Sequence, residues 1–238
     1  MVSSSEAQAN QRSQHMVFAV LSLGAAAATT ILYLFRVPYF RPYFGGINPP
    51  AAIALTAVLG AFSLRFLLTQ GWFQIYTGET RRGMILSAAV ATLFAVVVIA
   101  VDLTAGFPRD LNVPAPSSLL FYPVMAYVVE ICFHAVPLAL LLWFLGRPFQ
   151  ALDRKRLLWM CLCLTATLEP VFQVWTGYAA GKAFSWLGVY VGLQVFAINL
   201  LQLLVFWRYG FVAMYFFRLV YYIYWHIAWG SLRLKLLF

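Results

Sequence analysis

Apolar residues fill the chain in long runs, and short polar or proline-containing segments separate these runs. A run of about 20 apolar residues is long enough for a helix to cross the roughly 30 Å hydrocarbon core of a membrane. Seven runs come near this length or exceed it. They cover about residues 15–35, 50–70, 84–102, 118–146, 157–176, 184–206 and 211–231.

Each run is predicted to be a helix, because backbone groups in lipid must find hydrogen-bond partners within their own segment. Seven such helices use most of the 238 residues, so we expect an all-α, polytopic transmembrane helix bundle with about seven spans. Residues 1–14 are interpreted as a polar tail, and residues 15–238 as a single transmembrane domain. A signal peptide is the alternative for the first run. The apolar core of such a peptide has only about 7–15 residues, which favours an uncleaved span.

Composition supports this interpretation. Hydrophobic residues make up 63% of the chain and charged residues 10%, whereas a soluble domain has about 25% charged residues. The formal net charge of +9 does not indicate a nucleic-acid partner, because the basic residues lie singly or in short clusters between apolar runs. No zinc-finger, helix-turn-helix or RNP pattern is present. The expected surroundings are a lipid bilayer, together with membrane-protein substrates or partner subunits.

The basic residues between the runs bear on orientation. The N-terminal side of a seven-span bundle would collect Arg12, Arg81, Arg82, Arg147, Arg154, Lys155, Arg156 and Arg208. The other side would collect Arg36, Arg41, Arg109, Lys182, Arg233 and Lys235. The slight excess on the first side favours a cytoplasmic N-terminus under the positive-inside rule. We expect an integral protein of a bacterial-type inner membrane.

Ionisable residues inside the runs carry the strongest functional signal, because lipid makes them costly. Residues four positions apart share one face of a helix. Three runs contain polar residues at this spacing: Glu130 with His134, Glu169 with Gln173, and Arg218 with Tyr222 and then His226. We predict that these three polar stripes face one another or a wet cavity, where their charges nearly cancel.

Other roles remain open for several of these residues. A purely structural ion pair is the alternative for Glu130, Glu169 and Arg218, and His226 is interpreted as an interfacial residue near a helix end. The polar residues of the sixth run are interpreted as interhelical hydrogen-bonding groups rather than site residues: Gln194, Asn199 and Gln202. Pro170 is predicted to kink the helix or widen a turn beside Glu169. The three cysteines are interpreted as packing residues.

No cofactor or metal is expected. The three histidines are scattered and no HExxH motif occurs. A haem held by His134 and His226 is a weaker alternative, because His226 lies close to a helix end. A proton relay through Glu130, Glu169 and Arg218 would suit a transporter, but no inverted repeat is visible.

The segment from Val129 to Ala135 reads VEICFHA, and it resembles the EExxFRG motif of the CPBP intramembrane proteases (CAAX proteases and bacteriocin-processing enzymes). Glu130 and Phe133 match the second glutamate and the phenylalanine of that motif. Val129 replaces the first glutamate, and His134 and Ala135 replace the arginine and the glycine.

Later motifs of this family are matched in layout. The segment Glu169–Gln173 occupies the place of the FxxxH motif, with neither residue kept. Arg218 and Tyr222 stand at the histidine and asparagine of the HxxxN motif, about eight residues after Gly210. The resemblance covers roughly residues 116–229, which is half of the chain.

This resemblance implies a helical bundle with a polar cavity open to one leaflet, in which a glutamate activates water to attack a peptide carbonyl. Glu130 would be the general base, and His134 would partner the acid. Arg218 and Tyr222 would donate to the oxyanion, and Glu169 and Gln173 would rebuild the polar site in a different way. The alternative is a catalytically inactive relative that acts as an accessory or scaffold subunit of a membrane protein complex.

Overall fold

The computed structural model describes residues 4–146, 153–179 and 185–238, which form helices and turns without any β-strand. Six helices in this part of the chain are long and apolar enough to cross a membrane. They are α1 (Ser4–Leu34), α3 (Pro49–Thr69), α4 (Thr80–Ala105), the continuous span Ser118–Gly146, α7 (Arg154–Ala179) and α8 (Trp186–Tyr209). The predicted all-α polytopic fold is confirmed, and the chain is an integral, multi-pass membrane protein.

The seventh predicted run is also helical but differs in composition. It forms α9 (Phe211–Tyr222), a π-helical segment η4 (Ile223–Trp229) and α10 (Gly230–Leu236) in direct succession. Arg218 and His226 lower its hydropathy, and it is not one of the six apolar helices. The span Ser118–Gly146 has a similar construction, with α5 (Ser118–Val129), a π-helical segment η3 (Glu130–Ala135) and α6 (Val136–Gly146).

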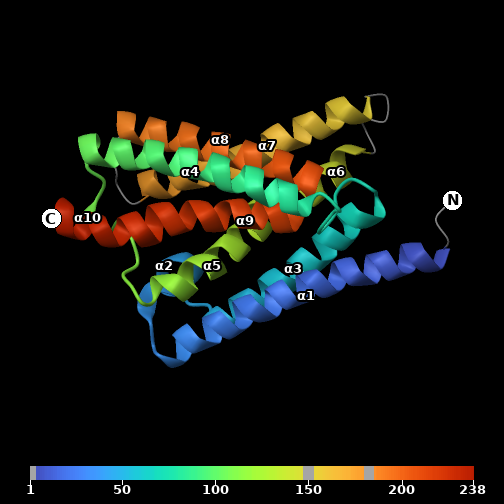
Figure 1. Ribbon diagram of the computed structural model, residues 1–238, viewed down its shortest axis with the longest axis horizontal. Helices are drawn as coiled ribbons and strands as arrows, with labels where there is room; N and C mark the ends of the chain where they lie inside the picture. The colour runs from blue at the N-terminus through green and yellow to red at the C-terminus, as the bar shows by residue number, and fades with distance from the viewer. Residues whose placement is uncertain (1–3, 147–152, 180–184) are drawn as a thin grey trace.

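Successive long helices run back and forth, so that the N-terminus and C-terminus lie at opposite ends of the bundle (Figure 1). Helix α1 packs along α3, and α7 packs along α8. Helix α9 is central, because it packs against α4, α8 and α5. Three short helices lie in the connections: η1 (Pro38–Phe40), α2 (Arg41–Phe44) and η2 (Arg109–Leu111).

Local sequence explains where two of the spans begin. Asn48 precedes α3, and its side chain accepts a hydrogen bond from the backbone of Ala51, while Pro49 and Pro50 fill positions that need no intrahelical donor. Ser185 caps α8 in the same way by accepting from the backbone of Gly188.

The tight turn between α8 and α9 depends on glycine. Gly210 has a φ of 95°, and a Cβ atom there would lie 2.8 Å from the carbonyl oxygen of Ile75. The backbone N–H groups of Phe211 and Val212 donate to the carbonyls of Gln74 and Ile75, each at 3.0 Å. This anchors the start of α9 to the α3–α4 connection, which fixes the depth of Arg218 in the bundle.

The segment interpreted as a polar tail is helical from Ser4 onward. The side chain of Gln14 is buried and accepts from the backbone N–H groups of Ile75 and Tyr76 at 2.8 and 2.9 Å. It also donates to the carbonyl of Tyr76 at 2.8 Å. Helix α1 is therefore attached to the α3–α4 connection by a polar residue that the sequence reading had placed outside the bundle.

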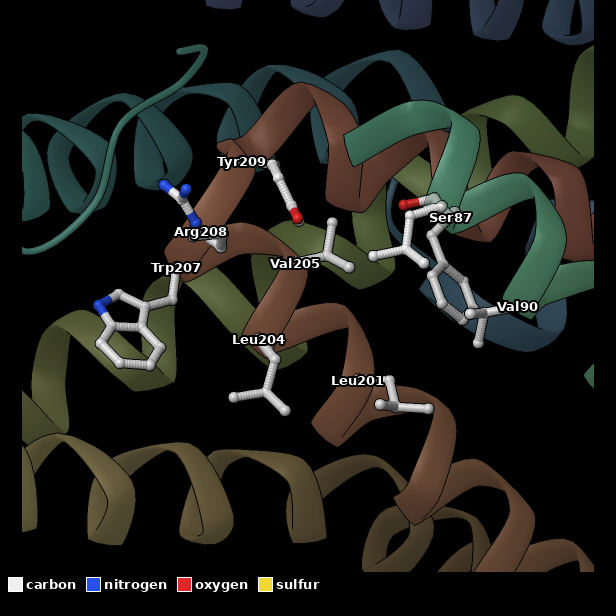
Figure 2. Close-up of a pocket in the computed structure, with 10 residues that line it drawn as sticks. Ser87, Val90, Leu201, Leu204, Val205, Trp207, Arg208 and Tyr209 are labelled. Carbon is white, nitrogen blue, oxygen red and sulfur yellow. The ribbon is translucent and has the colours of Figure 1, made fainter. Parts of the chain in front are cut away.

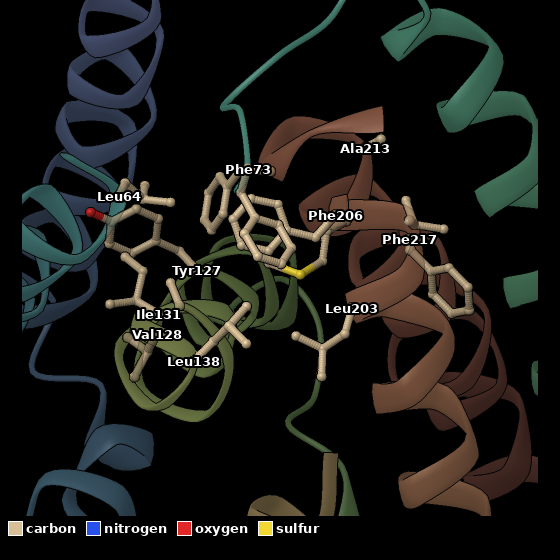
Figure 3. Close-up of a cluster of buried hydrophobic side chains, with 14 of the residues drawn as sticks. Leu64, Phe73, Tyr127, Val128, Ile131, Leu138, Leu203, Phe206, Ala213 and Phe217 are labelled. Atoms are coloured by element: carbon tan, nitrogen blue, oxygen red, sulfur yellow. The ribbon is translucent and has the colours of Figure 1, made fainter. Parts of the chain in front are cut away.

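The apolar core fills the space between α5–α6, α8 and α9 (Figure 3). The Tyr127 ring points toward α1 and stacks on Phe18 with ring centroids 6.1 Å apart, and Phe73 and Phe206 form a second aromatic group; all four side chains are buried. Ring centroids of Phe73 and Phe206 lie 4.5 Å apart. This packing surrounds the interior polar residues and leaves them little freedom to rearrange.

A buried ion pair that the sequence reading missed closes the end of the bundle near the C-terminus. Both groups are buried, and the Arg233 guanidinium donates to the Asp102 carboxylate at 2.7 and 2.9 Å. Arg233 also donates to the carbonyls of Phe107 and Pro108, and the Trp229 indole donates to Asp102. Arg233 is therefore a buried, paired residue of α10 (Gly230–Leu236) and not an exposed charge between helices. Two further basic residues that the sequence assigns to a membrane side, Arg147 and Lys182, lie outside the described residues.

Candidate functional site

A π-helical turn in the middle of the fourth span presents the first two site residues. Glu130 and His134 both lie in η3, and both are completely buried. Wide turns of this type are frequent at functional positions in helices. Beside Pro170 the prediction was a kink or a widened turn; no widened turn is found, since α7 continues through Pro170 as one α-helix.

Arg218 of α9 joins the two acidic residues. Its Nε atom donates to Glu130 Oε1 at 2.5 Å, and its two terminal nitrogens donate to the Glu169 oxygens at 3.3 and 3.1 Å. All three residues are buried, with exposed fractions of 0% for Glu130, 6% for Glu169 and 4% for Arg218. Glu130, Glu169 and Arg218, one residue from each of the three predicted stripes, therefore meet in the interior, with contributions from η3, α7 and α9.

His134 extends this network on the far side of Glu130. Its Nδ1 atom lies 2.6 Å from Glu130 Oε2, and because a carboxylate only accepts, Nδ1 carries the proton. The other ring nitrogen, Nε2, is buried and has no hydrogen-bond partner within the described residues. With a neutral imidazole, the two carboxylates and one guanidinium leave one net negative charge.

Two amide side chains from α8 complete the network. Gln202 donates to Glu130 Oε1 at 2.5 Å and accepts from Arg218 at 2.9 Å. Asn199 accepts from Arg218 at 3.0 Å and donates to the carbonyl of Ala166 at 3.4 Å. Their interpretation as interhelical hydrogen-bonding groups was incomplete, because both also bind the charged residues. Gln194 keeps the simpler role and donates to the carbonyl of Phe94 in α4.

The remaining predicted residues lie at the border of the network or outside it. The Tyr222 ring centroid is 5.9 Å from the Arg218 guanidinium carbon, and Gln173 donates to Glu169 at 3.2 Å from the exposed side of α7. His226 is separate, since its Nδ1 atom lies 2.6 Å from Asn112 Oδ1 and its ring stacks on Tyr122 at 4.6 Å.

The chemistry open to Glu130 follows from its hydrogen bonds. A carboxylate offers about four acceptor positions, and Arg218, Gln202 and His134 occupy three of them. At most one position remains for a water molecule. Glu169 is nearer the surface but shares the same guanidinium, so the two acids are held as a structural pair around one cation.

Two hollows are prominent on the bundle, and neither is lined by the residues of this network. One, of about 530 Å³, lies between α4 and α8 with α9 behind it (Figure 2). The other, of about 510 Å³, lies at the connection that leads from α1 into α3. Within the described part of the chain, no group of three or more His, Cys, Asp or Glu residues is placed to hold a metal ion.

Comparison with known proteins gives no relative from which to transfer a function. No family model, curated protein or solved structure matches this chain.

Proposed function

We propose that this chain is a non-catalytic relative of the CPBP intramembrane proteases and serves as an accessory or scaffold subunit of a membrane protein complex. The observation that carries the proposal is the state of Glu130. The residue is completely buried, and protein donors occupy both of its carboxylate oxygens. A general base must reach the proton that it removes, directly or through one water molecule.

The replaced motif residues support the same conclusion. Arg218 stands where the family has a histidine, and its guanidinium is neutralised by Glu130 and Glu169. Such a group binds carboxylates and does not pass a proton at neutral pH. A buried ionic network can instead define how helices align, and here it joins η3, α7, α8 and α9.

The outer face of α7 offers a surface for partner subunits. Phe172 and Trp175 are 52% and 73% exposed, and Val171 beside them is 62% exposed. Aromatic residues are enriched where membrane and protein partners meet. Val171 and Trp175 lie on the opposite side of α7 from Glu169 and Gln173, so a partner bound there would leave the network enclosed within the bundle.

An active peptidase is the second candidate, and the orphan nitrogen of His134 favours it. A buried polar atom without a protein partner marks room for a water molecule or a substrate group. In that case a water molecule bound at His134 Nε2 would be the nucleophile, with Nε2 accepting its proton and Glu130 holding the imidazole through Nδ1.

The decisive experiment compares peptide fragments released from membrane proteins in cells that express the wild type, Glu130→Gln or Asp102→Asn. The Asp102→Asn variant removes a buried carboxylate from the separate ion pair between Asp102 and Arg233, and it controls for destabilisation of the fold. We expect the same fragments in all three, and a stable complex with partner subunits after extraction in mild detergent. Fragments that disappear only with Glu130→Gln would overturn the proposal and establish a peptidase. A chain that extracts as a lone monomer would contradict the accessory role.

A further inference from the structure

The 530 Å³ hollow between α4 and α8 is the strongest feature that the polar network does not use. Its size falls within the range of about 300–1,000 Å³ that ligand pockets occupy. We refer to it as the α4–α8 groove. Its walls include Leu86, Val90, Leu201, Leu204, Val205 and, behind them, Phe217 of α9.

The groove is apolar along its length. Leu201, Leu204 and Arg208 follow one another at intervals of three and four along one face of α8, a distance of roughly 10 Å. The hydroxyl of Ser87 lies in the wall but donates to the carbonyl of Ala213 at 3.3 Å. The groove therefore offers carbon surface to its occupant, and Leu86, which is 45% exposed, shows that it opens toward the surrounding lipid.

One end of the groove carries a positive charge at the depth of the membrane interface. Arg208 lies between Trp207 and Tyr209 in the last turn of α8, and such aromatic residues mark the level of lipid headgroups. The groove lies beside these residues (Figure 2). An apolar channel with a cation at its headgroup end matches the shape and charge of an anionic lipid.

The Arg208 side chain has donors to spare. It is 60% exposed, and only its Nη2 atom is bonded, at 3.0 Å from each oxygen of Glu79. Its Nε and Nη1 atoms have no hydrogen-bond partner within the described residues. Exposed ion pairs of this kind contribute little to stability, so a phosphate can share or replace Glu79.

The surroundings of Arg208 are basic as well. Exposed basic residues at the same end of the bundle outnumber the acids Glu79 and Asp153; they are Arg81, Arg82, Arg154, Lys155 and Arg156. Basic residues near a membrane surface attract anionic lipids. The excess positive charge favours a lipid with an anionic headgroup over a lipid with a zwitterionic headgroup.

We propose that the α4–α8 groove binds one acyl chain of an anionic phospholipid, whose phosphate accepts hydrogen bonds from Arg208. Leu201, Leu204, Val205 and Val90 contact the chain. The binding site is independent of the Glu130 network and of the proposed accessory function.

The test measures lipid retained by the full chain. The protein is reconstituted in an equal mixture of phosphatidylglycerol and phosphatidylcholine, extracted, washed in detergent and analysed by mass spectrometry. We expect several-fold enrichment of phosphatidylglycerol on the wild type. Arg208→Gln should abolish the enrichment, and Glu79→Gln should increase it by removing the competing carboxylate. Val90→Phe, which fills the groove and keeps every charge, should lower phosphatidylglycerol retention.

The matched control is Arg156→Gln, which removes an exposed basic residue at the same end on α7, a helix that contributes no residue to the groove wall. It should retain phosphatidylglycerol like the wild type. Equal retention of both lipids by the wild type would overturn the proposal, as would wild-type retention by Val90→Phe. Equal losses with Arg156→Gln and Arg208→Gln would overturn it as well, because they would show general charge attraction rather than a binding site. Thermal unfolding of each variant in the same detergent verifies that the lost lipid does not reflect a lost fold.

Discussion

Arg218 holds more of the interior together than any other residue of the polar network. Its guanidinium binds two carboxylates and two amide oxygens that come from three neighbouring elements. Burial makes each of these contacts strong, but it also makes the loss of the cation expensive. The consequences of replacing Arg218 therefore measure whether the network stabilises the bundle.

Arg218→Met should lower the free energy of unfolding by about 3–5 kcal/mol, because it leaves Glu130 and Glu169 buried without their cation. Reversible unfolding in mixed micelles measures the change. The control is Arg208→Gln, which breaks an exposed pair and should cost no more than about 1 kcal/mol. Replacing both acids by glutamine in the Arg218→Met background should recover part of the loss. Similar losses for the two arginine variants would contradict a structural role for the network.

The sequence predicts the charged residues of the site better than its neutral ones. Glu130, Glu169 and Arg218 stand out because charges in lipid require a partner, and their spacing of four places the polar residues of each span on one face. Asn199 and Gln202 do not stand out, since amides in spans commonly form isolated interhelical hydrogen bonds. Asp102 and Arg233 lie at the ends of runs, where charges are ordinary, so their contact across 131 positions leaves no local signal.

At the scale of elements, the apolar runs predict the spans, but they do not predict where a span contains a widened turn. The predicted run 118–146 agrees with the observed span Ser118–Gly146. Its π-helical turn begins at Glu130, whereas proline chemistry had pointed to a widened turn at Pro170. Pro137 lies two residues after this turn and has no N–H to donate to the carbonyl of Phe133, so a second proline of the same kind accounts for the break in the helical hydrogen bonds there.

Gly83 allows α4 to approach the turn between α8 and α9, and this contact gives an element-scale prediction. A Cβ atom at Gly83 would lie 2.4 Å from the Cβ atom of Tyr209, whereas one at Gly24 of α1 would meet nothing within 4 Å. Gly83→Ala should cost about 1–3 kcal/mol by overpacking, and Gly24→Ala should be neutral or stabilise by up to about 1 kcal/mol. Thermal unfolding in detergent compares them. Equal effects of the two substitutions would mean that the close approach is not required.

At the scale of the whole molecule, the number of crossings depends on the last helical run. If α9, η4 and α10 cross the membrane, the chain has an odd number of spans and its ends lie on opposite sides, as in the arrangement of Figure 1. The contact between Arg233 and Asp102 supports this arrangement. It places α10 beside the C-terminal end of α4, although α9 begins next to the α3–α4 connection at the other end.

Single cysteines can test this topology in a background with Cys132, Cys161 and Cys163 replaced by alanine. Asp153→Cys reports the end where α7 begins, and Arg109→Cys and Lys235→Cys report the opposite end; all three positions are exposed. A membrane-impermeant maleimide applied to intact cells should label Arg109→Cys and Lys235→Cys alike and give Asp153→Cys the opposite result. Labelling after permeabilisation controls for access. If Lys235→Cys follows Asp153→Cys instead, the last run does not cross, and Arg218 cannot reach Glu130 and Glu169 from a spanning helix. The buried network and the seven-span topology therefore stand or fall together in this measurement.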